Sequence, residues 1–375
     1  DVFRVDTDAG VYCVETEANF DFIEPALSIV VFRKAAGDDA YDGEWIARTN
    51  HYNIYSSSGT IDMRRQRVYF MLDNDSGAYV QISPGEGISP RTYRVRVFRT
   101  RPVILVHGIE CYPKVAERDL PLGRNALGHW NDYLPWDGLA YPCVCHSFCW
   151  DSFTEHLYSN GEGVIGKILL DVERLQNQYS LDVVLIGHSM GGYFVRYALK
   201  EAAGRIYKAV TLGTPHYGSD IGNVFEPLPL LPRFKRTSRP NLKALKRASK
   251  FVWDMHAWGG REKLLSMAGV GAPPRVTVGY TDGLTDSDGV VPLSSGLLAG
   301  AHNVAVRTAD HGTIALATYV PLSCYPYDTA PAGFFGTVWS RVFNDDQNTN
   351  RLPAQTVLGN AVFTRIYHPV REFIK

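Results

Sequence analysis

A serine between glycines is the strongest chemical signal in the sequence. Residues 187–192 read Gly-His-Ser-Met-Gly-Gly, after an apolar run at 181–186 that predicts a strand and before a helical run at 193–200. A serine on such a turn takes a strained backbone conformation, and the residues two positions away on either side must be small to avoid collision. Both are glycine here. We therefore predict that Ser189 is a nucleophile; the alternative is a helix start with an idle serine.

A serine nucleophile needs a base, and the base needs a carboxylate that orients it. After a nucleophile on a strand-to-helix turn, the acid follows in the chain and the histidine comes last. A predicted strand at 275–279 precedes an acid-rich loop. Asp288 is the predicted acid in that loop, with Asp282 and Asp286 as alternatives.

The predicted base is His311. It follows the apolar run 304–306, which is a predicted strand, and precedes the helix-like residues 313–317. A loop at the end of a strand is the place from which a base can reach the nucleophile. Of the eleven histidines, His216 and His302 are the alternatives.

The oxyanion formed by attack on a carbonyl group needs N–H donors. The turn places the backbone N–H of Met190 at the start of a helix, whose dipole favours a developing negative charge. A second donor is expected in the loop after the strand 103–106, and the backbone N–H of Ile109 is the candidate. His107 is interpreted as a structural histidine and His188 as a packing residue.

Buried strands that alternate with amphipathic helices indicate a mostly parallel sheet flanked by helices in residues 100–375. Strands are predicted at 103–106, 183–186, 209–212 and 276–278, and a helix at 164–175. Residues 217–266 fit this alternation poorly and are predicted to form a lid or cap insertion over the sheet. Between Arg233 and Lys250 this segment holds eight Lys or Arg residues and no acid, which is typical of a lipid-contacting helix or of a solvated face.

Residues 1–99 have a different texture, with short β-rich runs separated by Gly, Asp, Asn and Ser. Strands are predicted at 27–32, 67–72, 78–82 and 92–98. They are expected to form a small antiparallel β-sandwich, an accessory domain whose residues do not point to a role. Arg101 and Pro102 mark the junction, so we place the domain boundary near residue 100.

The composition is that of an ordinary globular protein. The 375 residues are 45% hydrophobic and 21% charged, and a formal net charge of -1 gives no bias toward nucleic acid. The sequence has no apolar run long enough for a membrane span and no signal-peptide pattern at Asp1. An even count of six cysteines leans toward an oxidising compartment. We expect a mature, secreted or extracytoplasmic protein, with a cytoplasmic location as the alternative.

Three cysteines lie close together beside His146, at positions 143, 145 and 149. Their spacing is not a usual one for zinc. On a strand, Cys143 and Cys145 would share one face, so this cluster is interpreted as buried thiols or as disulfide partners near Cys111.

These residues resemble the lipases and esterases of the α/β-hydrolase superfamily, and in particular bacterial triacylglycerol lipases. The resemblance covers roughly residues 100–320 and rests on residues 106–108, 187–192, 212–219, 288–291 and 311. It implies an α/β-hydrolase fold, a mobile lid at 217–266, and a site made of Ser189, Asp288, His311 and the N–H groups of Ile109 and Met190. Membrane-bound inositol deacylases share the Gly-His-Ser-Met-Gly-Gly and Gly-Thr-Pro-His patterns, so the ester need not be a triglyceride. No position clearly matches the calcium ligands of some bacterial lipases, and no metal is expected.

The sequence therefore predicts a serine carboxylic-ester hydrolase that cleaves acyl esters through an acyl-enzyme intermediate. The apolar loop at 225–234, with Trp253 and Trp258, favours an acyl-chain or lipid substrate and a peripheral contact between the cap and a lipid interface. The alternatives are an acyltransferase or an inositol or other lipid deacylase with the same triad, and a non-catalytic binding protein on a hydrolase fold. We expect no cofactor and no nucleic-acid partner, and the sequence does not fix an oligomeric state.

Overall fold

The computed structural model describes residues 1–6, 8–18, 27–33, 44–48, 65–72, 78–84, 92–108, 127, 130, 133–134, 143–148, 150, 157, 163–219, 243–247, 249–256, 259–270, 287–316 and 360–375. The chain divides into two compact units. One holds Asp1–Pro102, Asp132–Val144 and Arg174–Asp182, and the other holds Val103–Asn131, Cys145–Glu173 and Val183–Lys375. The assignment of residues 1–99 to a separate accessory domain stays a prediction.

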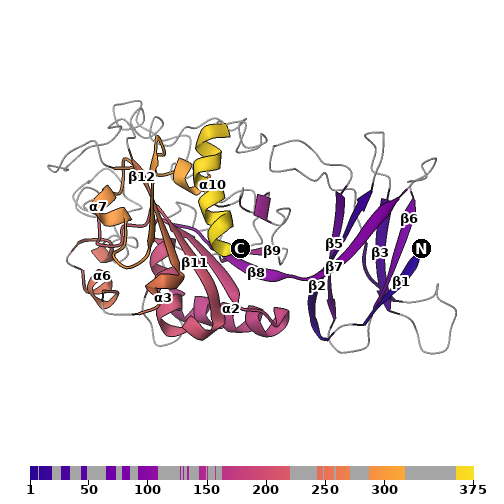
Figure 1. The fold of residues 1–375 in the computed structure, drawn as a ribbon. Coiled ribbons are helices and arrows are strands. Elements are labelled where there is room, and N and C mark those ends of the chain that lie inside the picture. Colours follow the sequence, from indigo (N-terminus) through magenta and orange to yellow (C-terminus); the bar gives the residue numbers. More distant parts are fainter. Residues whose placement is uncertain are drawn as a thin grey trace, which may run out of the picture. The chain divides into compact units, whose positions relative to one another are not determined.

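The first unit contains two antiparallel sheets (Figure 1). The strand order β1-β6-β3-β4 is formed by Val2–Val5, Ala78–Pro84, Leu27–Arg33 and Glu44–Arg48. The order β5-β2-β7 is formed by Arg65–Leu72, Gly10–Ala18 and Tyr93–Arg99. Alternate residues of both sheets meet in one apolar core, which includes Val14, Ile29, Phe70 and Val80. The four predicted strands are confirmed, and β1, β2 and β4 are additional strands.

A six-stranded sheet dominates the second unit, with the order β13-β12-β11-β10-β8-β9. Its strands are β8 (Arg101–Val106), β9 (Cys143–Phe148), β10 (Val183–His188), β11 (Ile206–Leu212), β12 (Leu264–Val270) and β13 (His302–Arg307). The pairings that join β8, β10, β11, β12 and β13 are all parallel. Parallel strands are buried on both faces, and every residue of β8 and β10 is accordingly buried.

Helices alternate with these strands (Figure 1). Helix α2 (Val164–Tyr179) precedes β10, α3 (Gly191–Glu201) packs against β10 and β11, and α10 (Asn360–Ile374) packs against β11, β12 and β13. The short helices are η3 (Ala203–Arg205), α6 (Lys250–Asp254), η4 (Arg261–Lys263), α7 (Leu293–Gly296) and η5 (Thr313–Ala315). None of the helices in the described ranges is long and apolar enough to cross a membrane. The predicted fold class, a mostly parallel sheet flanked by helices with an N-terminal pair of antiparallel sheets, is confirmed.

Strand β12 was not predicted. Its sequence, Leu-Leu-Ser-Met-Ala-Gly-Val, lacks the β-branched run of a typical buried strand, yet six of its seven residues are buried. The hydroxyl of Ser266 tolerates burial because it donates to the carbonyl of Gly296 at 2.8 Å. The last residues of the segment assigned to the cap, 264–266, therefore belong to the sheet. Residues 220–242 of the cap and the predicted strand at 276–278 lie outside the described residues.

Candidate active site

The predicted nucleophile stands on the turn between β10 and α3. Ser189 has a φ of 53°, a left-handed conformation that non-glycine residues adopt at a cost. A Cβ on Gly187 would lie 2.7 Å from the Val195 side chain, and one on Gly191 would lie 2.3 Å from the Val106 carbonyl oxygen. The predicted need for small residues on both sides of the serine is thus confirmed, since β8, β10 and α3 leave no room for a side chain.

The loop after β8 passes directly beside the serine. A Cβ on Gly108 would lie 2.8 Å from the Cβ of Ser189 and 3.4 Å from its hydroxyl oxygen. Glycine at this position therefore lets the loop approach the nucleophile. Met190 is fully buried and directly precedes α3. Ile109 lies outside the described residues, so its role as the second oxyanion donor remains a proposal.

Both ring nitrogens of His107 are engaged in this loop. Nε2 accepts from the backbone N–H of Trp150 at 3.2 Å, so Nδ1 carries the proton and donates to the carbonyl of Gly108 at 2.8 Å. The ring also stacks on the indole of Trp150, with centroids 5.6 Å apart. A histidine held in this way orients the loop and has no nitrogen available for proton transfer.

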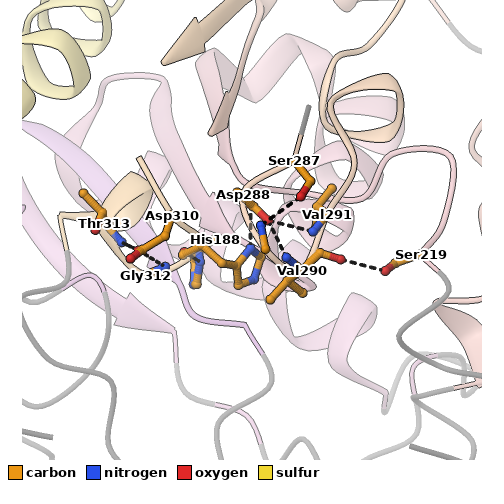
Figure 2. Close-up of polar contacts among 11 residues, drawn as sticks. His188, Ser219, Ser287, Asp288, Val290, Val291, Asp310, Gly312 and Thr313 are labelled. Atoms are coloured by element: carbon orange, nitrogen blue, oxygen red, sulfur yellow. Dashed lines mark hydrogen bonds and ion pairs between the residues drawn. The ribbon is translucent and has the colours of Figure 1, made fainter. Parts of the chain in front are cut away.

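Asp288 and His311 form a buried pair, with Nδ1 of the imidazole 2.8 Å from Oδ2 of the carboxylate. The other carboxylate oxygen accepts the backbone N–H groups of Val290 and Val291 at 2.9 and 2.6 Å (Figure 2). These donors stabilise a negative charge on a residue that is only 2% exposed. Because a carboxylate accepts, Nδ1 carries the proton and Nε2 remains the basic nitrogen of His311.

Local backbone geometry holds the pair in place. Residues 287–292 form a tight turn, closed by a bridge between its first and last residues and by a bond from the Asp288 N–H to the Val291 carbonyl at 3.2 Å. Gly289 gives this turn its left-handed φ of 92°. On the other loop, Oδ1 of Asp310 accepts the N–H groups of Gly312 and Thr313 at 3.1 and 2.7 Å, and these bonds hold the turn that leads into η5.

Two glycines that the sequence analysis did not assign to the site leave room for this pair. A Cβ on Gly213 would lie 3.0 Å from Oδ2 of Asp288 and 3.2 Å from Nδ1 of His311, and the backbone of Gly213 is left-handed with a φ of 56°. A Cβ on Gly269, on β12, would lie 2.8 Å from the Cβ of Asp288. The sequence could have pointed to Gly213, because this glycine directly follows a predicted strand. It could not have pointed to Gly269, because strand β12 was not predicted.

The histidine loop also contacts the residue that precedes the nucleophile. The rings of His188 and His311 have centroids 4.8 Å apart. In the part of the chain that the structure describes, the Ser189 hydroxyl makes no hydrogen bond. Catalytic hydrogen bonds often tighten only when substrate is bound. The bond between Ser189 and His311 therefore belongs to the proposal.

The alternative bases are engaged elsewhere. The Nε2 of His216 contacts the hydroxyls of Thr211 and Ser266 at 3.0 and 2.9 Å, and burial, followed by the charge of Arg196, lowers the pKa of His216 well below its ordinary value. His302 lies exposed at the start of β13. The alternative acids, Asp282 and Asp286, lie outside the described residues. Within the described ranges, no three His, Cys, Asp or Glu side chains are placed to hold a metal ion.

No family model matches the chain, and no curated protein matches it. Among solved structures, it is similar to the lipase BlEst2 of Bacillus licheniformis in its mature form (17% identity, TM-score 0.41, covering 58% of this chain and 87% of that chain). It is also similar to the metagenomic carboxyl esterase MGS0156 (20%, TM-score 0.43, 73% and 76%) and to Est1E of Butyrivibrio proteoclasticus with bound ferulic acid (15%, TM-score 0.35, 57% and 82%).

Proposed function

We propose that the protein is a serine carboxylic-ester hydrolase with Ser189 as nucleophile, His311 as general base and Asp288 as the acid that orients it. The observation that carries the proposal is the buried bond of 2.8 Å between Nδ1 of His311 and Oδ2 of Asp288. This bond leaves Nε2 as the basic nitrogen, on a loop in contact with the turn that holds a strained serine. A base oriented by a carboxylate beside a serine hydroxyl is the arrangement that acyl transfer needs.

In the proposed reaction, Ser189 attacks the ester carbonyl while Nε2 of His311 takes the hydroxyl proton. Asp288 stabilises the imidazolium, and the backbone N–H groups of Ile109 and Met190 donate to the oxyanion, each contributing about 3 kcal/mol. His311 then gives its proton to the departing alcohol, which leaves an acyl-enzyme. Water, deprotonated by the same nitrogen, attacks the acyl-enzyme and releases the acid and the free serine.

A series of aryl esters from acetate to octanoate tests this function and its substrate class. We expect kcat/KM to rise with acyl-chain length, because each added methylene transferred from water to an apolar site contributes up to about 0.8 kcal/mol. Release of the aryl alcohol measures the rate, and glycerol added as acceptor reveals any transfer to an alcohol. A steep preference for acetate would refute the acyl-chain substrate, and ester product formed on glycerol would favour an acyltransferase. If the protein hydrolyses no ester of the series, the proposed function is wrong.

We further propose that the cap rests on an anionic lipid surface. Trp253 on α6 is 64% exposed, while Phe251 and Val252 on the same helix are buried. Indole side chains favour the interface between lipid and water, and basic residues favour anionic headgroups. The described part of the cap carries four basic residues before Trp253, namely Lys243, Lys246, Arg247 and Lys250.

Replacing Trp253 by serine is expected to weaken binding to vesicles of phosphatidylglycerol and phosphatidylcholine about tenfold, because partial insertion of one large aromatic side chain contributes about 1.4 kcal/mol. Sedimentation with the vesicles measures the binding. The matched control is Leu170→Ser on α2, which removes an apolar side chain that is 62% exposed outside the cap. Equal binding by the two variants would exclude the cap as the lipid contact. Hydrolysis of a soluble short-chain ester should be unchanged in both.

A further inference from the structure

The side chain of His188 is joined to the loop that carries the proposed base. Its Nε2 lies 2.8 Å from the main-chain carbonyl oxygen of His311, and His188 as a whole is only 7% exposed. A carbonyl oxygen only accepts, so Nε2 of His188 carries the proton and donates it to this bond. The sequence analysis assigned His188 a packing role, whereas the ring is bonded to the main chain of the site.

With this bond, three hydrogen bonds fix His311. Its backbone N–H donates to the carbonyl of Asp288 at 2.9 Å, its carbonyl accepts from His188, and its Nδ1 donates to the Asp288 carboxylate. The only polar atom of His311 left to meet a reacting group is Nε2. The bond from His188 differs from the other two because His188 directly precedes Ser189, so this bond joins the base loop to the nucleophile turn.

We propose that His188 is a positioning residue whose Nε2–H bond to the carbonyl of His311 sets the separation between the imidazole and the Ser189 hydroxyl. This inference rests on the proposed function, because it concerns the geometry of that same base and nucleophile. Displacement of a reacting group by about 1 Å can reduce a rate about 100-fold. A hydrogen bond between the nucleophile turn and the base loop can therefore affect the rate although neither of its atoms takes part in the reaction.

The charge state of His188 suits this role. The other titratable groups that act on it are His311 and His107, and either would repel a positive ring. Burial, and then the charge of His311, lowers the pKa of His188 to about 3, although its bond to the His311 carbonyl acts in the opposite direction. His188 is therefore neutral at ordinary pH, keeps its donor, and does not compete with His311 for the serine proton.

Three substitutions separate positioning from packing. His188→Phe keeps a ring but loses the donor, His188→Gln places an amide nitrogen near the position of Nε2, and His188→Asn places it near Nδ1, short of the carbonyl. We expect kcat to fall about 10-fold to 100-fold in the Phe and Asn variants with KM changed less than about twofold, and to stay within about threefold of wild type in the Gln variant. Each rate is divided by the fraction of the protein whose Ser189 reacts with a fluorophosphonate when the labelling has gone to completion. A loss of folded protein then does not lower the normalised rate.

The outcomes are distinguishable. If the Phe variant has the kcat of wild type per titrated serine, His188 only fills space and the inference is wrong, whatever the change in thermal stability. If the Phe variant does not fold, the comparison of Gln with Asn decides, and equal kcat values for these two amides would overturn the inference. A wild-type chain that hydrolyses no ester and is not labelled at Ser189 would remove the proposed function, and the inference with it.

Discussion

Replacing Ser189 by alanine is expected to lower kcat for ester hydrolysis by five to six orders of magnitude, about the loss seen when a triad nucleophile is removed from a serine hydrolase. The remaining donors and the binding site cannot supply a covalent intermediate. The substitution should leave the fold intact, because the Ser189 hydroxyl makes no hydrogen bond within the described residues and alanine is no larger than serine. Initial rates on the preferred aryl ester, with the midpoint of thermal unfolding as a check, measure both expectations.

Ser180 offers a matched control for this substitution. It is an exposed serine with the same left-handed φ of 53°, and it directly follows α2, on the other side of strand β10 in the chain from Ser189. Ser180→Ala should retain the wild-type rate and the wild-type labelling by fluorophosphonate. If Ser189→Ala hydrolyses ester as fast as Ser180→Ala does, Ser189 is not the nucleophile and the proposed function has to be abandoned.

The nucleophile turn is the part of the fold that the sequence predicts best, because its requirements are local. Ser189 takes a left-handed φ, and the two glycines beside it are forced by neighbouring backbone within 3 Å. Such a constraint acts on residue types within two positions of the serine, so it can be found by eye in one sequence. The long apolar runs of β8 and β10 and the spacing of α2 are local signals of the same kind.

Other features of the site depend on residues far apart in the chain. His188 donates to a carbonyl 123 residues away, and a main-chain acceptor leaves no trace in residue types. Gly213 is needed because Asp288 and His311 lie against it, which only the folded sheet brings about. Strand β12 was missed because its buried serine, methionine and glycine do not follow the β-branched, apolar pattern of a typical buried strand. The serine is tolerated there because its hydroxyl has a hydrogen-bond acceptor, which only the folded chain supplies.

Replacing Asp288 by asparagine is expected to lower kcat/KM by about four orders of magnitude, because it puts the proton of His311 on the wrong nitrogen. The N–H groups of Val290 and Val291 donate to Oδ1, so the amide oxygen must occupy that position. The amide NH2 then faces Nδ1 of His311 in place of Oδ2. An NH2 group donates, so Nδ1 becomes the acceptor and Nε2 holds the proton. The nitrogen that is proposed to take the serine proton then has no free lone pair. Volume and buried hydrogen bonds are conserved, so the midpoint of thermal unfolding should change little.

Asp310→Asn is the control for this change of charge. Asp310 is next to the base, and its Oδ1 accepts the N–H groups of Gly312 and Thr313. The amide oxygen of asparagine can accept the same two hydrogen bonds. Rates of Asp310→Asn within about threefold of wild type, together with the loss in Asp288→Asn, would separate tautomer control from the general loss of a negative charge near the site. If Asp288→Asn retains more than about a tenth of the wild-type rate, another carboxylate orients His311, and Asp282 and Asp286 on the same acid-rich loop become the residues to replace. We expect the loss rather than this outcome, because the two backbone donors at residues 290 and 291 leave the amide a single orientation.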